Sequence, residues 1–592
     1  MKKIYIFSWV FILFAAASCK KGGFLDTKTT ATINAATTFA DSTNTMDFLA
    51  GLYSDIAYNY QIASAHNLMD YSKNADEGEG RYPAGGNYDK IFTQGTFASG
   101  FFNQQQTEWT LFYSVIRNCN IFLANVDKSP LSAAKKKRVK AEARFIRALH
   151  TFYAVRSFGG IPLLGDDVFD TDAEAVQKRS TYEECVNYIV SELDAISGEL
   201  PLSYNGLDFG RITKGACLGL KSRMLLFAAS PLYNGGGTAP SDAELQKLLC
   251  YPAADNNRWE KARLAAKAVM DMGIYSLVTD NTTKWGGNPT GLGYGFYKTF
   301  ITRNNSEFIL PRPLPTGKQM ETYGNPKSRG GANFYCYPTQ ELVDWFPTIN
   351  GKPIATDIKS ASNPLGYDAS NPYVNRDPRL SATVVYNGGL LFLNSTKTLS
   401  AVDTYVGAAS GDGIVALSSN TATITGYYWR KMCDENASVQ GGNNVDRSLP
   451  VIRYAEILLN YAEATNETGN AVEAMNTLKL LRARAGINAG ADGMYGLPAS
   501  PAKDDARLII QNERAIELAF EQHRIWDIRR WKLGPQLDGK FVHGMQITRT
   551  GTTYTYKKID VRTRYFKDNY YYFPIPKDDV TINPSLLQNP GY

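Results

Sequence analysis

Residues 141–164 read AEARFIRALHTFYAVRSFGGIPLL, and this stretch decides the fold. Its apolar residues recur at steps of three and four, the period of one helical face; they are Ala141, Phe145, Ala148, Leu149, Phe152 and Val155. The positions between them are also partly apolar, because they include Ile146 and Tyr153. A helix that is apolar on several sides packs on several sides. We therefore expect a central helix over Ala141–Phe158, with Phe145 and Phe152 buried and with Gly159, Gly160 and Pro162 at its end.

The same periodicity predicts further helices on both sides of this one, in an order that suits antiparallel pairs. They are Asp41–Tyr60, Gln104–Val126, Tyr182–Ile196, Thr213–Ser230, Trp259–Met272, Leu449–Ala464, Ala471–Ala485 and Asp504–Trp531.

Residues 275–446 differ in character, because Gly, Asn, Pro, Ser and Thr clusters interrupt them every few residues. Here we expect one short helix, Pro338–Trp345, and short strands such as Ala382–Tyr386 and Tyr427–Lys431. The sequence therefore predicts a mainly α protein. Its helical scaffold spans residues 41–274 and 447–592, and a large irregular, loop-rich insertion with short strands spans residues 275–446.

The composition indicates a globular protein with many aromatic side chains. Of the 592 residues, 44% are hydrophobic and 20% are charged, with 63 basic against 57 acidic side chains, so nucleic-acid binding has little support. The basic run Lys135–Arg138 opens the central helix and is typical of a solvated face. The chain contains 36 Tyr, 28 Phe and 8 Trp. An excess of Tyr suits surfaces that bind amphipathic ligands, and it equally suits a wide aromatic core.

The N-terminus has the pattern of an export signal. Lys2 and Lys3 precede an apolar run, Ile4–Ala17, which is too short to span a bilayer. The run ends in small residues before Cys19, which is typical of a lipoprotein signal, although Ala16 stands where Leu is usual. We expect residues 1–18 to be removed, Cys19 to carry acyl chains, and residues 19–40 to form a tether. The lipid would then be the only membrane anchor.

No catalytic or metal-binding motif is found in the sequence. The six cysteines after Cys19 form no Cys-x-x-Cys pair, and their disulfide state is left open. His-Glu-x-x-His, Gly-x-Ser-x-Gly, Walker and EF-hand patterns do not occur. The one enzyme-like cluster is Glu513, Glu517, Glu521, His523 and Asp527, which could hold an acid/base pair. A charge lattice with Arg514, Arg524, Arg529 and Arg530 is the favoured interpretation. We expect no enzymatic activity, catalytic residue, cofactor or metal.

Several motifs in one order carry a resemblance to a known family. They are Glu142–Leu149 with Phe152-Tyr153 and Phe158–Leu163, Phe24-Leu25-Asp26, Thr213–Tyr233, Leu449–Ala464, Asn512–Trp531 and Phe573–Tyr592. Together they resemble the SusD/RagB family of nutrient-binding outer-membrane lipoproteins. The resemblance implies a SusD-like domain over residues 41–592, whose scaffold over residues 41–274 and 447–592 is tetratricopeptide-like.

The resemblance also implies a function. It suggests a lipid-anchored protein, facing the cell exterior, that binds oligosaccharide and passes it to a SusC-like TonB-dependent transporter. A peptide ligand, as in the RagB branch, is the alternative. A glycoside hydrolase is disfavoured, because the sequence shows no isolated carboxylate pair.

Glycan binding needs exposed aromatic rings for the sugar faces and polar groups for the hydroxyls, held on loops over a rigid scaffold. Two loop regions combine these residue types, and the resemblance places ligand contacts in corresponding loops. The candidate residues are Asp76, Arg81, Tyr82, Trp285, Tyr294, Tyr323, Arg329 and Tyr335. We expect the rings of Trp285, Tyr294 and Tyr82 to lack helical packing partners, although core packing is the competing interpretation for each.

Overall fold

The computed structural model describes residues 35–57, 60, 70–80, 95–98, 108–169, 177–331, 336–392, 398–416, 422–437 and 444–592. The predicted leader, Cys19 and most of the tether lie outside these residues. Within the described part of the chain, no helix combines the length and the apolar character needed to cross a membrane.

The central helix is α7, Ala133–Phe158, and it is the most enclosed element of the fold. From Ala141 to Phe158 every side chain except that of Arg144 is buried. Phe145 and Phe152 are fully buried, as predicted. The helix ends at Gly159, whose φ of 81° lies in the region that favours glycine. The apolar character on all sides of α7 is therefore explained by neighbours on all sides.

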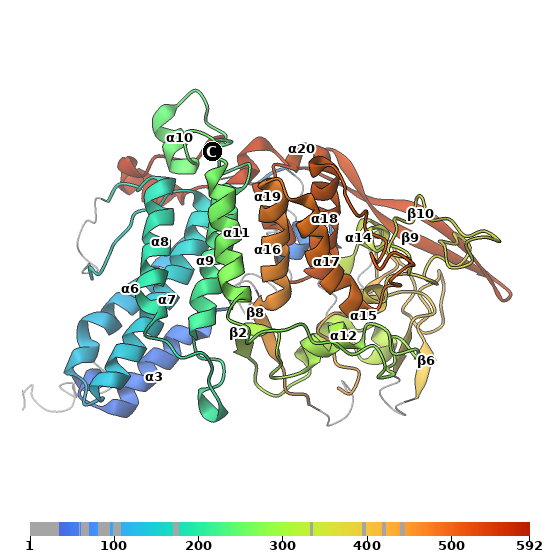
Figure 1. The fold of residues 1–592 in the computed structure, drawn as a ribbon, viewed down its shortest axis with the longest axis horizontal. Coiled ribbons are helices and arrows are strands. Elements are labelled where there is room, and N and C mark those ends of the chain that lie inside the picture. The colour runs from blue at the N-terminus through green and yellow to red at the C-terminus, as the bar shows by residue number, and fades with distance from the viewer. Residues whose placement is uncertain are drawn as a thin grey trace, which may run out of the picture.

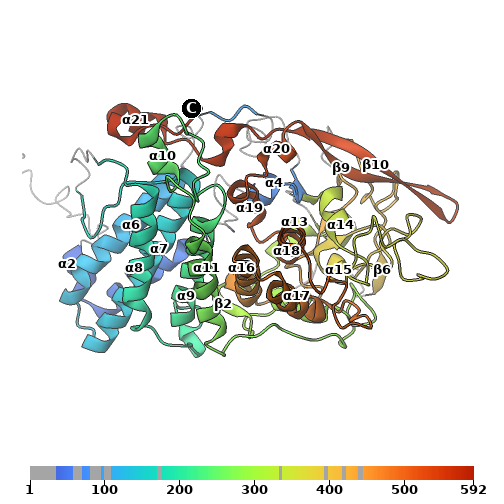
Figure 2. The ribbon, with the colours of Figure 1, turned by 45° about the horizontal axis from the view of Figure 1, so that its top comes forward.

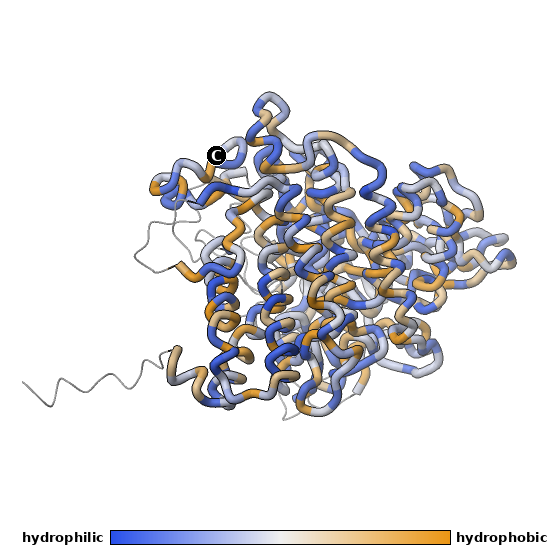
Figure 3. The backbone as a smooth tube through the Cα atoms, turned by 60° about the vertical axis from the view of Figure 1, so that its left-hand side comes forward, coloured by the Kyte–Doolittle hydropathy of each residue, from blue (hydrophilic) through white to orange (hydrophobic). Residues whose placement is uncertain are grey.

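These neighbours form a row of helices that runs across the molecule (Figures 1 and 2). Successive members contact one another in the order α6, α7, α8, α9, α11 and α16, and α17 and α18 pack on α16. Their bounds are α6 Glu108–Asn125, α8 Tyr182–Ser197, α9 Lys214–Ala229, α11 Asn257–Met270, α16 Tyr454–Glu467, α17 Ala471–Ala485 and α18 Lys503–Glu517. Apolar and polar residues alternate along these helices (Figure 3). The mainly α scaffold of helical pairs is thus confirmed.

Smaller helices cover the ends of the row. They are α2 Ala35–Phe39, α3 Ser42–Leu52, α4 Asp70–Lys73, α10 Ala243–Leu249, α19 Arg524–Arg530, α20 Gly534–Leu537 and α21 Lys577–Ile582, with 3₁₀ turns η1 Tyr53–Asp55, η4 Val126–Lys128, η5 Gly206–Asp208, η7 Asp568–Tyr571 and η8 Pro584–Leu586.

The irregular region contains short helices and two-stranded antiparallel sheets. Its helices are α12 Tyr294–Ile301, α13 Gln319–Gly324, α14 Gln340–Trp345 and α15 Arg379–Thr383, with the 3₁₀ turn η6 Lys327–Arg329. Its strand pairs are β1 Gly78–Glu79 with β3 Tyr337–Pro338, β4 Val384–Val385 with β7 Tyr428–Trp429, and β5 Leu390–Phe392 with β6 Leu399–Ala401. The pair β4–β7 lies within the two predicted strand ranges, and α14 lies within the predicted short helix.

Two predicted helices are wrong in part. Residues Ser448–Arg453 form strand β8, which pairs with β2, Phe308–Pro313, before α16 begins at Tyr454. The predicted helix Asp504–Trp531 is two helices, α18 and α19. Between them Phe520 and Gln522 adopt φ values of 59° and 64°, which a helix cannot contain. In both places, contacts with distant segments outweigh the local helical pattern.

The longest sheet element is a hairpin that the sequence interpretation did not include. Strand β9, Lys540–Thr550, pairs with β10, Thr553–Arg564, with one irregularity between Asp560 and Arg562. Figure 1 shows this hairpin reaching along the upper right of the molecule. Alternating Thr, Tyr and Val side chains in β10 are typical of a strand with one face covered.

The segment after the hairpin returns to the first half of the chain and closes over the end of α7. The backbone N–H of Phe573 donates to the carbonyl of Ser157 at 2.7 Å. The Asn589 amide donates to the carbonyl of Phe158 at 2.9 Å, and Arg179 donates to the carbonyl of Leu587 at 2.8 Å. Residues 573–589 therefore complete the environment of the central helix.

Candidate functional site

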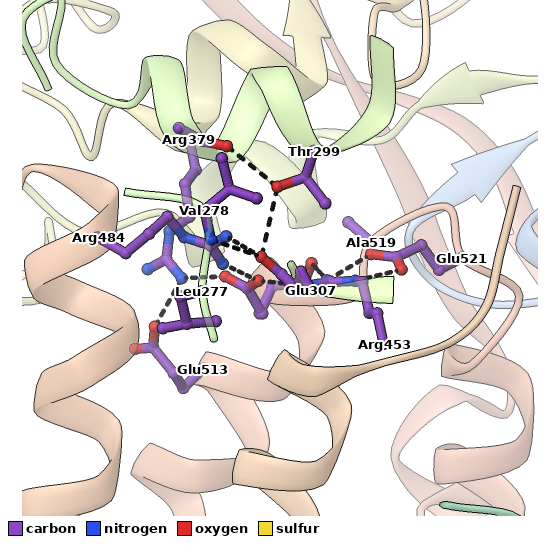
Figure 4. Close-up of polar contacts among 12 residues, drawn as sticks. Leu277, Val278, Thr299, Glu307, Arg379, Arg453, Arg484, Glu513, Ala519 and Glu521 are labelled. Atoms are coloured by element: carbon purple, nitrogen blue, oxygen red, sulfur yellow. Dashed lines mark hydrogen bonds and ion pairs between the residues drawn. The ribbon is translucent and has the colours of Figure 1, made fainter. Parts of the chain in front are cut away.

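The acidic cluster that could have held an acid/base pair is a buried ion network (Figure 4). Its carboxylates are Glu307, Asp377, Glu513, Glu517 and Glu521, and its cations are Arg379, Arg453, Arg482, Arg484 and Lys431. The five negative charges thus meet five positive charges.

The network has no solvent access. Arg453 joins three carboxylates, with 2.6 Å to Glu307, 2.8 Å to Glu517 and 2.6 Å to Glu521. Burial alone would raise the pKa of Glu517, but the guanidinium groups of Arg484, Arg453 and Arg379 hold that pKa well below its usual range. Burial lowers the pKa of Lys431 to about 8 although Glu521 opposes the shift. These carboxylates are structural, as the charge-lattice interpretation holds.

The predicted charge lattice is confirmed for one carboxylate and differs for three. Glu513, Glu517 and Glu521 pair with cations from other segments, whereas Asp527 pairs with two of the expected arginines. Arg514 and Arg530 hold Asp527, at 2.9 Å and 2.7 Å, and Arg524 holds Asp76 at 2.7 Å. Among the residues that the structure describes, no group of three His, Cys, Asp or Glu side chains is placed to hold a metal ion. The six described cysteines are buried and free.

Trp285 does not have the exposed loop position that was expected. Its side chain is 4% exposed, and its ring stacks on Tyr297 of α12 at 4.3 Å. The Arg430 guanidinium lies 4.8 Å from the centroid of the Trp285 ring, as a cation–π pair. Tyr294, half-buried at the start of α12, also approaches Tyr297, at 6.2 Å. The expectation of a ring without a helical packing partner is therefore wrong, because α12 supplies that partner.

The charged candidates are engaged within the protein. Both carboxylate oxygens of Asp76 accept hydrogen bonds from Arg524, at 2.7 and 2.8 Å. Arg329 is 3% exposed and donates to Ser328, Ser400 and the carbonyl of Ala401. Burial lowers the pKa of Arg329. Tyr323 is half-buried in α13, and Arg81, Tyr82 and Tyr335 lie outside the described residues. The ligand role of all these residues stays a prediction.

A surface groove lies on the other half of the molecule, between α6 and the segment of α21 and η8. Its volume is about 440 Å³, and its walls are more apolar than polar. Residues from four parts of the chain line this α6 groove: Trp109, Thr110, Tyr113, Ser114 and Arg117; Pro162, Leu164, Asp167 and Phe169; Gln177; and Asp579, Ile582, Asn583 and Leu586. Concave sites of this size, with few polar groups, are typical of small-ligand binding.

The aromatic side of the groove is held by the scaffold. Trp109 and Tyr113 lie one turn apart on α6, with ring centroids 4.8 Å apart. The Trp109 ring also packs edge-on against Phe158 at 5.1 Å, and the Tyr113 hydroxyl donates to the carbonyl of Pro162 at 2.9 Å. Phe169, which also lines the groove, is half-buried. These contacts fix the orientation of two rings that border the groove.

The charged and amide groups that line the groove are those of Arg117, Asp167, Gln177, Asp579 and Asn583. Arg117 contacts the carbonyl of Phe169 at 3.4 Å, and Asn120 holds the loop by donating to the carbonyl of Asp167 at 2.8 Å. Burial raises the pKa of Asp579, and the neighbouring Asp578 adds to this shift. The groove thus offers cationic, anionic and amide groups around an aromatic wall.

Sequence reasoning missed this groove because its walls come from residues between 109 and 586. Trp109 is a core residue, with 7% of its surface exposed, and it also borders the groove. The sequence of α6 alone could have indicated the groove. Thr110, Ser114 and Arg117 lie beside Trp109 and Tyr113, and a helix face that is packed against the protein would not carry these polar residues.

The fold is a row of helical pairs with an open surface groove. Comparison of the chain with known proteins shows which family has this fold. A sequence model described as "SusD family" matches residues 297–592, and one described as "Starch-binding associating with outer membrane" matches residues 24–226. The first match covers half of the chain, so the protein belongs to the SusD family.

Individual relatives agree with this assignment. A SusD-like protein of Formosa agariphila is 32% identical over 180 residues, which are 30% of this chain and 31% of that relative. The starch-binding protein SusD of Bacteroides thetaiotaomicron is 33% identical over 136 residues, 22% of this chain and 23% of the relative. These alignments span less than a third of either relative. The crystal structure of a SusD-like protein from Bacteroides fragilis superposes with a TM-score of 0.71 at 26% identity, covering 94% of this chain and 98% of that one.

Proposed function

We propose that the protein is a non-enzymatic, carbohydrate-binding lipoprotein of the outer membrane, and that it holds oligosaccharide in the α6 groove. The observation that carries the proposal is the pair of half-buried rings, Tyr113 and Phe169, that line the groove, with the Trp109 ring packed on Tyr113 at 4.8 Å. Aromatic rings bind the C–H faces of sugars, and Arg117, Asp167 and Gln177 offer donors and acceptors for hydroxyl groups. The starch-binding description of the family match and of one relative supports this class of ligand.

The proposal extends to a handover of the ligand. A groove that opens on the surface can release an oligosaccharide to a second protein without unfolding. We place a SusC-like TonB-dependent transporter as that partner, and the lipidated Cys19 as the anchor that keeps the two together at the cell exterior. The outer-membrane association in the family description supports this location.

The groove is tested by calorimetric titration of starch-derived and other glucan oligosaccharides against Phe169→Ala and Arg117→Ala. Each change removes one group that faces the groove, so we expect binding about tenfold weaker, or roughly 1.4 kcal/mol. The melting temperature should stay nearly unchanged, because Phe169 is only half-buried.

Phe541→Ala provides the matched control, since this ring is 50% exposed on β9 and does not line the groove. Unaltered affinity in both groove variants would place the carbohydrate site elsewhere. Binding of peptides without binding of oligosaccharides would favour the peptide alternative. Release of reducing sugar from the bound oligosaccharide would contradict a non-enzymatic role.

A further inference from the structure

The loop between α8 and α9, residues 198–213, lies at the lower ends of these two helices in Figure 1, and we name it the finger. Its tip is the short turn η5, where Leu207 is fully exposed, and Leu202 is 53% exposed. A hollow of about 200 Å³ separates one side of the finger from Ile274 and its neighbours, and a hollow of about 390 Å³ separates the other side from α3. The tip of the finger is therefore exposed, whereas its base contacts the body at Glu142 and Pro313.

The base of the finger is fixed by one buried carboxylate, that of Glu142 in α7. Glu142 accepts hydrogen bonds from the hydroxyl of Tyr53 at 2.7 Å, from the hydroxyl of Tyr204 at 3.2 Å, and from Arg211 at 2.7 Å. The N–H of Lys214 closes the loop by donating to the carbonyl of Pro201 at 2.9 Å. Because the base is held in this way, the fold keeps Leu207 in water instead of letting it collapse onto the protein.

A basic segment contacts one side of the base of the finger. Residues 127–142, the turn before α7 and its first part, carry six cationic side chains and two carboxylates. This segment touches the finger, because Lys137 lies 2.5 Å from Glu199 and the Arg138 guanidinium lies 5.6 Å from the ring of Tyr204. Lys137 and Lys140 are paired with Glu199 and Asp127, which leaves a positive excess on Lys135, Lys136 and Lys128.

We propose that the finger and this basic segment form a direct contact with an anionic membrane surface, with Leu202 and Leu207 inserted among the lipids. Exposed leucines beside aromatic rings, with lysines around them, are typical of protein surfaces that bind the membrane interface. Lysines near such a surface are attracted by anionic headgroups. The finger adds one cation, Arg211, and two carboxylates, Glu199 and Asp208, so residues 127–142 and 198–213 together carry seven cations against four carboxylates. This net positive charge beside a narrow apolar area favours an anionic surface as the occupant.

The position of the finger agrees with this occupant, and this step rests on the proposed lipid anchor at Cys19. Figure 1 shows α3 and the finger, the loop below α9, at the same lower end of the molecule. About 16 residues separate Cys19 from the first described helix, a span of at most roughly 55 Å. The finger then gives the tethered protein a second point of contact, which limits its orientation on the membrane.

The test uses the mature chain from residue 20, without leader or acyl chains, so that only the protein surface can bind. Its partitioning is measured by co-sedimentation with vesicles of phosphatidylcholine alone and of phosphatidylcholine mixed with phosphatidylglycerol. We expect binding to the anionic vesicles. Leu202→Ser with Leu207→Ser should lower the partition coefficient about tenfold, and Lys135→Glu with Lys136→Glu should lower it by a similar factor.

Two matched variants separate the finger from a general surface effect. Leu508→Ser removes a leucine that is 65% exposed on α18, and Lys557→Glu reverses an exposed charge on β10; both should bind vesicles as the unaltered chain does. Melting temperatures of the finger variants should match that of the unaltered chain, because neither leucine is buried.

Three results would overturn the proposal. They are absence of vesicle binding by the unaltered chain, unchanged binding of the leucine variants, and complete release by inorganic phosphate, which would show charge attraction without insertion. If the leucine variants lost association with the transporter but bound vesicles as the unaltered chain does, the proposal would also be overturned, and the finger would be assigned to a protein interface. The vesicle assay contains no sugar and no acyl chain, so its failure is distinguishable from failure of the carbohydrate-binding proposal.

Discussion

At the scale of single residues, Trp285 shows how a loop aromatic becomes part of the core. Two neighbouring glycines, Gly286 and Gly287, make the chain look irregular there, and a Cβ at Gly287 would lie 2.2 Å from the Trp285 ring. The close approach of this backbone to the ring requires glycine. The ring is thus enclosed by its own loop on one side and by Tyr297 on the other.

The first prediction at this scale concerns the stability contributed by Trp285. Trp285→Ala removes a buried ring and leaves a cavity beside Tyr297 and Arg430, so we expect it to lower the free energy of unfolding by about 3–5 kcal/mol. Urea denaturation followed by circular dichroism measures this loss. Phe541→Ala, at an exposed ring, should change the unfolding midpoint little. An unchanged midpoint in Trp285→Ala would show that the ring is not part of the core.

At the scale of elements, the ion network explains why α18 ends where it does. Lys431 donates to the carbonyls of Glu517 and Ala519, at 2.9 and 2.8 Å, and Arg453 donates to the carbonyl of Glu517 at 2.8 Å. The N–H of Phe520 donates to Glu77 at 3.1 Å. Side chains from distant segments thus satisfy backbone groups that the interrupted helix leaves free.

The prediction at this scale uses Lys431→Met, which keeps the length of the side chain and removes its charge. Glu521 then loses a partner at 2.7 Å inside the core, and two carbonyls lose their donor. Breaking a buried pair from one side costs about 3–5 kcal/mol, so we expect a marked drop of the melting temperature. Lys557→Met, at an exposed lysine of β10, is the matched control. Equal melting temperatures for the two variants would show that the network does not hold the helix end.

The elements also show which parts of the fold sequence reasoning can reach. Helices such as α7 and α17 were predicted because their apolar residues recur at helical spacing. Strand β8 was missed because its partner, β2, lies some 140 residues away. The break after α18 was missed because it depends on Lys431, Arg453 and Glu77. Local pattern indicates local structure, and it fails where a distant segment supplies the hydrogen bonds.

The same limit applies to the candidate site. Residue types suited to carbohydrate were found in the loops, but sequence could not show that Asp76 is paired with Arg524 or that Arg329 is buried. The α6 groove needed residues 109–117, 162–169 and 579–586 to be placed together, and no sequence pattern connects them. The residue types indicated which chemistry a binding site could have, whereas the position of the α6 groove depended on the tertiary fold.

At the scale of the whole molecule, the prediction concerns the anchor. Cys19→Ala removes the thiol that would be acylated, so we expect loss of palmitate labelling and a shift of the protein from the membrane fraction to the soluble fraction. Cys119→Ala, at a buried cysteine of α6, should retain the label. Persistent labelling of Cys19→Ala would show that the lipoprotein interpretation is wrong. Protease treatment of intact cells would then establish which side of the membrane the protein faces.

The contacts of residues 573–589 with the end of α7 have a consequence for biogenesis. The carbonyl of Ser157 receives its donor from Phe573, and that of Phe158 receives one from Arg179 and a second from Asn589, so two of these three donors lie more than 400 residues later in the chain. Until these residues are synthesised, the first half of the chain therefore lacks two of the donors at this end of its main helix. The α6 groove is likewise unfinished until residues 579–586 have emerged. The chain therefore completes the walls of this groove only near the end of its synthesis.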